Sequence, residues 1–159
     1  MKTFCLATCL AIAALTLLAC GAPEPEKKAA VTPPPPPVVK DHTAIMPPAG
    51  LRSAEVVPNH LLGKSDMPGG TLASYESKGK KYQMFVIDVE DNQKAAFLLV
   101  DMKKTLQEPD YIDYMGGYFG RDQTQPIYVF AKLHYLAGVV GLSKADADPL
   151  ARVLASRLH

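Results

Sequence analysis

Apolar positions in the middle of the chain alternate with the period of two that is typical of β-strands. Residues 71–77 and 81–89 follow this pattern on either side of Lys78-Gly79-Lys80, which predicts a hairpin. Both faces of the second strand are apolar: Phe85, Ile87 and Val89 on one, and Tyr82, Met84 and Val86 on the other. We therefore expect this strand to be covered on both sides, by helices on one and by the N-terminal segment on the other.

Helical spacing replaces the alternation after residue 90. Asp91 or Asn92 can cap a helix that runs to about Leu106, with lysines in its last turn as the helix dipole prefers. Its apolar stripe consists of Ala95, Leu98, Leu99 and Met102. The stretch Glu108-Pro109-Asp110 is expected to end the helix.

Strand patterns return at residue 114. Residues 114–121 and 126–132 predict a second hairpin, and residues 135–141 predict a third strand of this group. Ser143 can open a capping turn, and Asp148-Pro149 predicts a helix start, because Pro is favoured at the first helical position. Pro149 therefore argues against one straight helix from residue 144. The final helix has an apolar stripe of Leu150, Val153, Leu154 and Leu158.

The predicted order is β-β-α-β-β-β-α in a single domain of residues 51–159. Because hairpins predominate, we expect an α+β fold with a mainly antiparallel sheet of about five strands and both helices on one face. A domain of this length can bury one modest core without covalent staples.

The N-terminus has the pattern of a secretory leader. Lys2 precedes an apolar or small stretch from Phe4 to Leu18, which is shorter than the roughly 20 residues that span a membrane. Leu17-Leu18-Ala19-Cys20 follows, and it resembles the lipobox of bacterial prolipoproteins. That resemblance implies a signal peptide of residues 1–19, cleavage before Cys20 and acyl chains such as palmitate on that residue.

Further expectations about location follow from the same resemblance. Such lipoproteins are held in the cell envelope by their acyl chains, and two or three chains make a lasting anchor. In such lipoproteins an Asp directly after the lipidated cysteine usually retains the protein in the inner membrane. Gly21 occupies that position here, so we expect the protein to lie in the outer membrane and to face the periplasm. Residues 20–50 are expected to be a lipid-anchored tether, because residues 21–58 hold ten of the fourteen prolines and favour an extended chain.

Charge and cysteine content exclude several classes of function. Lysine and arginine number 17 against 16 acidic residues, and Lys2 belongs to the leader, so the mature chain is formally neutral. A neutral domain lacks the basic surface that nucleic acid requires. The only cysteines of the sequence are Cys5, Cys9 and Cys20, which precede the domain. The domain therefore has no disulfide, zinc-thiolate site or cysteine nucleophile.

Histidines and carboxylates offer no recognisable catalytic or metal motif. His42 falls in the tether, and no pair of histidines has metal-ligand spacing. His60 near Asp66, or His134 near a carboxylate, could form a site only through tertiary contact. Two acidic groups flank the first helix and are interpreted as solvated loop charge: Asp88, Glu90 and Asp91 before it, and Glu108, Asp110 and Asp113 after it.

The glycine-rich residues 116–120 lack the order of a phosphate-binding loop, and we interpret them as allowing a bulge or close strand packing. No serine-hydrolase motif is present. The domain is rich in tyrosine, a residue enriched at interfaces, and Tyr82, Tyr118 and Tyr128 are the candidate binding residues. Half-buried strand tyrosines are the plainer interpretation.

Stretches at 116–120, 127–132 and 137–142 resemble small exported bacterial proteins whose domains carry no assigned function. The favoured hypothesis is a non-enzymatic envelope module, without cofactor or metal, that binds a protein or a small apolar or carbohydrate ligand on the sheet face not covered by helices. Two alternatives stay open. One is a small enzyme or metal binder assembled around His60 or His134, and the other is a structural spacer with no ligand.

Overall fold

A computed structural model describes residues 38–123 and 125–159. The expected signal peptide, the lipidation site Cys20 and the first part of the expected tether lie outside these residues.

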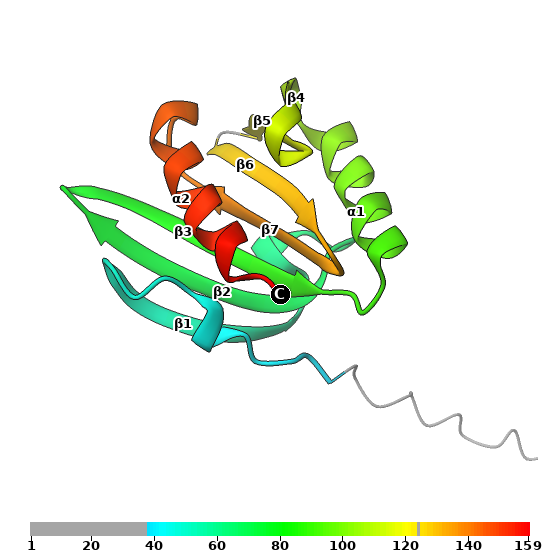
Figure 1. Ribbon diagram of the computed structural model, residues 1–159, viewed down its shortest axis with the longest axis horizontal. Coiled ribbons are helices and arrows are strands. Elements are labelled where there is room, and N and C mark those ends of the chain that lie inside the picture. The colour runs from blue at the N-terminus through cyan, green and yellow to red at the C-terminus, as the bar shows by residue number, and fades with distance from the viewer. Residues whose placement is uncertain (1–37, 124) are drawn as a thin grey trace, which may run out of the picture. The chain divides into compact units, whose positions relative to one another are not determined.

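Within the described residues, seven strands form one antiparallel sheet in the order β1-β2-β3-β7-β6-β5-β4 (Figure 1). The strands are β1 (Leu51–Asn59), β2 (Pro68–Ser77), β3 (Lys80–Asp88), β4 (Gln107–Ile112), β5 (Gly117–Asp122), β6 (Gln125–Lys132) and β7 (Tyr135–Val140). Two antiparallel meanders, β1–β3 and β4–β7, meet where β3 pairs with β7. The α+β class and the antiparallel sheet are confirmed, but the expected count of five strands is wrong.

The two missed strands are the edges of the sheet. No residue of β1 is buried, and Ile112 is the one buried residue of β4. Each strand also contains a proline, Pro58 or Pro109, which edge strands tolerate because one side of the backbone has no strand to pair with. The apolar alternation that identifies a strand is therefore weak in both.

Helices α1 (Asn92–Thr105) and α2 (Lys144–Arg157) pack on opposite faces of the sheet. Leu99 and Met102 of α1 join a core with Phe85 and Ile87, whereas Leu154 of α2 joins a core on the other face. The expectation that both helices share one face is therefore wrong. Because the central strands are apolar on both sides, each face requires its own cover.

Capping explains where the helices begin. The Asp91 carboxylate accepts the backbone N–H groups of Gln93 and Lys94 at 2.8 and 2.9 Å, as expected for an N-cap. Ser143 caps α2 through the N–H of Asp146. α2 continues through Pro149, so the prediction of a separate helix from Asp148 is wrong: the Ser143 cap starts the helix before the proline, which α2 accommodates.

Residues 38–50 lie against the sheet rather than apart from it. Met46 is buried in the core on the α2 side, close to the 3₁₀ turn η1 (Thr43–Ile45). The hydroxyl of Tyr75 donates to the carbonyl of Pro47 at 3.0 Å, and Arg157 of α2 donates to the carbonyl of Ile45. The folded body therefore begins before Leu51. None of the helices in the described residues combines the length and the apolar character needed to cross a membrane.

Candidate functional site

A recess of about 380 Å³ opens on the α1 face of the sheet, beside the 3₁₀ turn η2 (Leu61–Gly63). Its lining combines aliphatic side chains with amides and charges: Val57, His60, Leu62, Lys64, Leu72, Gln83, Asp122, Gln123, Gln125 and Val140. A second hollow of about 530 Å³ adjoins it and shares Gln83, Gln125 and Val140. The sheet surface at this end is therefore concave and is not filled by a helix.

Strand alternation explains why these side chains share the recess. Gln83 lies two residues before Phe85 on β3, and Gln125 lies two residues before Ile127 on β6, so both amides are on the α1 face. Val140 of β7 pairs with both Gln83 and Ile127 and lies in the floor between them. α1 packs over β5, β6 and β7 and leaves this end of the sheet open.

An ion pair borders one side of the recess. Lys64 Nζ lies 2.9 Å from the Asp122 carboxylate, and the two side chains are only 12% and 15% exposed. Lys64 also donates to the hydroxyl of Thr105 at the end of α1, at 3.2 Å. Because these charges already have partners, the recess offers a ligand amide donors and acceptors above an aliphatic floor. Such a lining fits an uncharged polar group.

No protein family, curated protein or solved structure matches this chain. What the recess can bind must therefore be derived from the side chains that line it. Sequence reasoning did not single out Gln83 or Gln125. Each interrupts the apolar stripe of a strand that faces a core, and that interruption is the signal that could have found them.

The three candidate tyrosines do not form one surface. Tyr82 and Tyr128 belong to the core on the α2 side, where Tyr128 is fully buried and Tyr82 stacks on Tyr75 with ring centroids 5.1 Å apart. Tyr118 packs on the α1 side, with Lys103 Nζ 5.1 Å from its ring centroid. Tyr118 is the one of the three that remains partly exposed.

Asp148 gathers hydrogen bonds from three elements. The hydroxyls of Tyr128 on β6, at 2.9 Å, and of Tyr114 in the 3₁₀ turn η3 (Asp113–Met115) donate to one oxygen. Arg152 Nε donates to the other at 3.0 Å, and its guanidinium lies over the ring of Tyr114. Burial raises the pKa of Asp148, but these hydrogen bonds outweigh burial and hold the pKa below its usual value. Burial, and then the contact with Asp148, raises the pKa of Tyr128.

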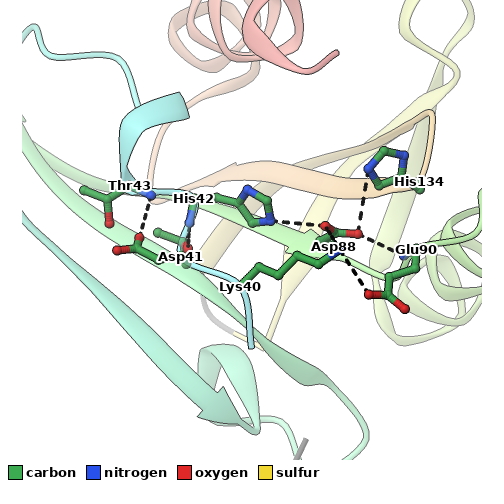
Figure 2. Close-up of polar contacts among 8 residues, drawn as sticks. Lys40, Asp41, His42, Thr43, Asp88, Glu90 and His134 are labelled. Atoms are coloured by element: carbon green, nitrogen blue, oxygen red, sulfur yellow. Dashed lines mark hydrogen bonds and ion pairs between the residues drawn. The ribbon is translucent and has the colours of Figure 1, made fainter. Parts of the chain in front are cut away.

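A second polar cluster surrounds Asp88 at the end of β3 (Figure 2). Lys40 Nζ lies 3.2 Å from the Asp88 carboxylate, which is 6% exposed, and 3.0 Å from Glu90. His42 and His134 approach the same carboxylate through Nε2, at 3.3 and 3.8 Å. The backbone N–H of His42 donates to the Thr71 hydroxyl at 2.9 Å. This cluster attaches the N-terminal segment to the sheet.

Electrostatics in this cluster favour the ionised carboxylate. Burial raises the pKa of Asp88, but hydrogen bonds from the Glu90 backbone N–H and from Lys40 outweigh burial and leave the pKa lowered. Hydrogen bonds to Glu90 and Asp88 raise the pKa of Lys40. Asp88 and Lys40 are therefore both charged near neutral pH, and the Lys40 ammonium group is the cation beside Asp88.

The enzyme and metal hypothesis depends on His60 and His134. His60 lines the recess, and His134 lies near Asp88, so neither is remote from polar partners. In residues 38–123 and 125–159, however, no three His, Cys, Asp or Glu side chains are placed to hold a metal ion. In the acidic group after α1, Asp110 forms an ion pair with Lys144.

Glycines in residues 116–120 serve strand packing, as expected. A Cβ on Gly117 would lie 2.4 Å from the carbonyl oxygen of Val129 and 2.8 Å from Cβ of Phe130. Gly116 has a positive φ of 59° and closes η3 before β5 begins. Residues 117–120 of this segment therefore belong to β5.

Proposed function

We propose that the protein is a lipoprotein of the bacterial cell envelope, anchored through Cys20 and facing the periplasm from the outer membrane. Support for the anchor comes from the leader of residues 1–19 and the lipobox-like end of that leader. In this proposal the folded domain is a non-enzymatic binding module that recognises an envelope protein or a small ligand through the recess.

The observation that carries this proposal is the open recess between β1, β2, β3, β7 and β6. A structural spacer needs no hollow in its sheet, whereas here Gln83 and Gln125 face one with an aliphatic floor. A binding site typically joins an apolar wall to a few polar groups that fix orientation. The recess has that composition, and the two charged side chains at its border, Lys64 and Asp122, are already paired with each other.

Site-specific photo-crosslinking in cells tests the proposal. A photoreactive phenylalanine derivative replaces Val57, which lines the recess from β1 and leaves both amides in place, in one variant, and Ser156 on the exposed side of α2 in a matched control. We expect discrete adducts from position 57 and none from position 156. Replacing Gln83 and Gln125 by Leu in the position-57 variant should reduce the adducts, because it removes both amides from the recess. Equal labelling at both positions, or no adduct at position 57, would contradict a ligand in the recess.

A further inference from the structure

The exposed side of α1 carries apolar side chains that the core does not use. Ala95, Leu99 and Met102 form the buried stripe of the helix. On the opposite side Phe97 is 67% exposed and Val100 is 45% exposed, although both are large and apolar. Their spacing of three residues places them on one helical face, together with Gln93 and Lys104. We refer to Gln93, Phe97, Val100 and Lys104 as the α1 outer face.

The helix that carries these apolar residues has an excess of positive charge. It contains Lys94, Lys103 and Lys104 against the single acid Asp101, which pairs with Lys104 at 2.7 Å, and Lys104 is 68% exposed. Lys103 lies over the ring of Tyr118, which contacts the ring of Tyr111, and Tyr111 is 57% exposed. Exposed aromatic and aliphatic side chains flanked by lysines suit the boundary between lipid headgroups and acyl chains.

The N-terminal segment reaches the domain next to the start of this helix. Val38, the first described residue, is 96% exposed. Two residues later Lys40 binds Glu90, which lies just before α1 (Figure 2). Any anchor on the N-terminal side of Val38 therefore pulls on the domain beside the α1 outer face.

Chain length limits how far the domain can move from such an anchor. Residues 21–37 separate Cys20 from Val38, and a chain of that length spans at most about 60 Å when fully extended. Confinement this close to the bilayer gives a high effective concentration at the lipid surface, so even a weak contact is occupied.

We propose that the α1 outer face docks the domain onto the anionic lipid surface, with Phe97 and Val100 entering the headgroup region and the α1 lysines facing acidic headgroups. This inference rests on the proposed anchor at Cys20. It adds an orientation: α1 lies on the membrane, and α2, on the opposite face of the sheet, points away from it.

Single-cysteine labelling of the full lipidated chain tests the orientation. Since every cysteine of the sequence lies at or before Cys20, a cysteine introduced in the domain is the only free thiol of the lipidated protein. An environment-sensitive fluorophore is placed at Gln93→Cys, which keeps Phe97 and Val100, and at Ser156→Cys on α2 as control. The proteins are reconstituted in vesicles of phosphatidylethanolamine and phosphatidylglycerol, with and without doxyl-labelled lipid as quencher.

We expect doxyl lipid to quench the label at position 93 and not the label at position 156. Phe97→Ser with Val100→Ser should abolish the quenching, whereas Val153→Ser, which removes an exposed valine from α2, should leave it unchanged. Omitting phosphatidylglycerol from the vesicles should weaken the quenching at position 93. Equal quenching at both positions would overturn the inference. A blue-shifted, unquenched signal that grows with protein density would also overturn it, by assigning the α1 outer face to a second copy.

Flotation of the same samples separates the anchor from the docking. A chain that floats with vesicles but shows no quenching at position 93 refutes the docking and leaves the anchor intact. A chain that does not float refutes the proposed anchor and, with it, this inference.

Discussion

The side chain of Tyr128 is fully buried, so its hydroxyl must find a partner inside the protein. Asp148 supplies the acceptor while also binding Tyr114 and Arg152. One carboxylate thus joins β6, η3 and α2. Sequence alone suggested that Asp148 caps a helix. It left Tyr128 as a candidate binding residue, with a half-buried strand tyrosine as the plainer interpretation.

Replacing Asp148 by Ala should lower the free energy of unfolding by about 1–3 kcal/mol, because the buried Tyr128 hydroxyl loses its acceptor. Urea denaturation measures the change. Asp101→Ala is the matched control, since Asp101 forms only an exposed pair with Lys104 and should cost less than about 1 kcal/mol. In a Tyr128→Phe background the cost of Asp148→Ala should shrink. Equal costs in both backgrounds would show that the hydrogen bond contributes nothing.

Asp88 predicts a specific acid dependence of stability. Its pKa in the folded protein is lowered from the ordinary value of 3.8, so the unfolded chain binds its proton first as pH falls. The stabilisation is therefore complete well above pH 3.8 and is lost as pH falls through the lowered pKa. Asp88→Asn should flatten the acid limb of a plot of unfolding free energy against pH. Asp101→Asn, which removes an exposed ion pair on α1, is the control, and an acid limb unchanged in Asp88→Asn would contradict the account.

At the scale of elements, the helices and strands with strong apolar periodicity were predicted well, whereas the edge strands of the sheet were not. The hairpin of β2 and β3, the helix α1 and the run β5–β7 follow the sequence pattern closely, because their apolar residues fill a core. β1 and β4 were missed since their side chains are mostly exposed. The recess could not be predicted either, because it depends on Gln83, Gln125 and Val140 meeting from three strands.

Pro149 is the clearest conflict between local preference and the observed helix. Proline has no N–H, so the carbonyl of Ala145 four residues earlier lacks its helical donor. Pro149→Ala should therefore raise the free energy of unfolding by about 1–2 kcal/mol, the restored bond outweighing the added freedom of the unfolded chain. Thermal or urea unfolding measures it, with Ala145→Gly as an opposite control that should destabilise α2. A Pro149→Ala variant less stable than the wild type would mean that the proline is favoured where it stands.

At the scale of the whole molecule, the two faces of the sheet are covered differently. α2 and residues 38–50 cover one face of the sheet, while α1 and η2 cover part of the other and leave the recess open. The Asp88 cluster fixes where the N-terminal segment arrives, beside the start of α1. The recess and α1 share one face of the sheet, so a domain docked through the α1 outer face would have the recess on its membrane side.

Mass spectrometry of the N-terminal peptide, taken from protein extracted from cell membranes, tests the anchor on which the proposed function depends. We expect the mature chain to start at Cys20, with a diacylglycerol group on its sulfur and, in the complete product, an acyl chain on its amine. A mature chain that starts at another residue, or one that carries a free thiol at Cys20, would contradict the account.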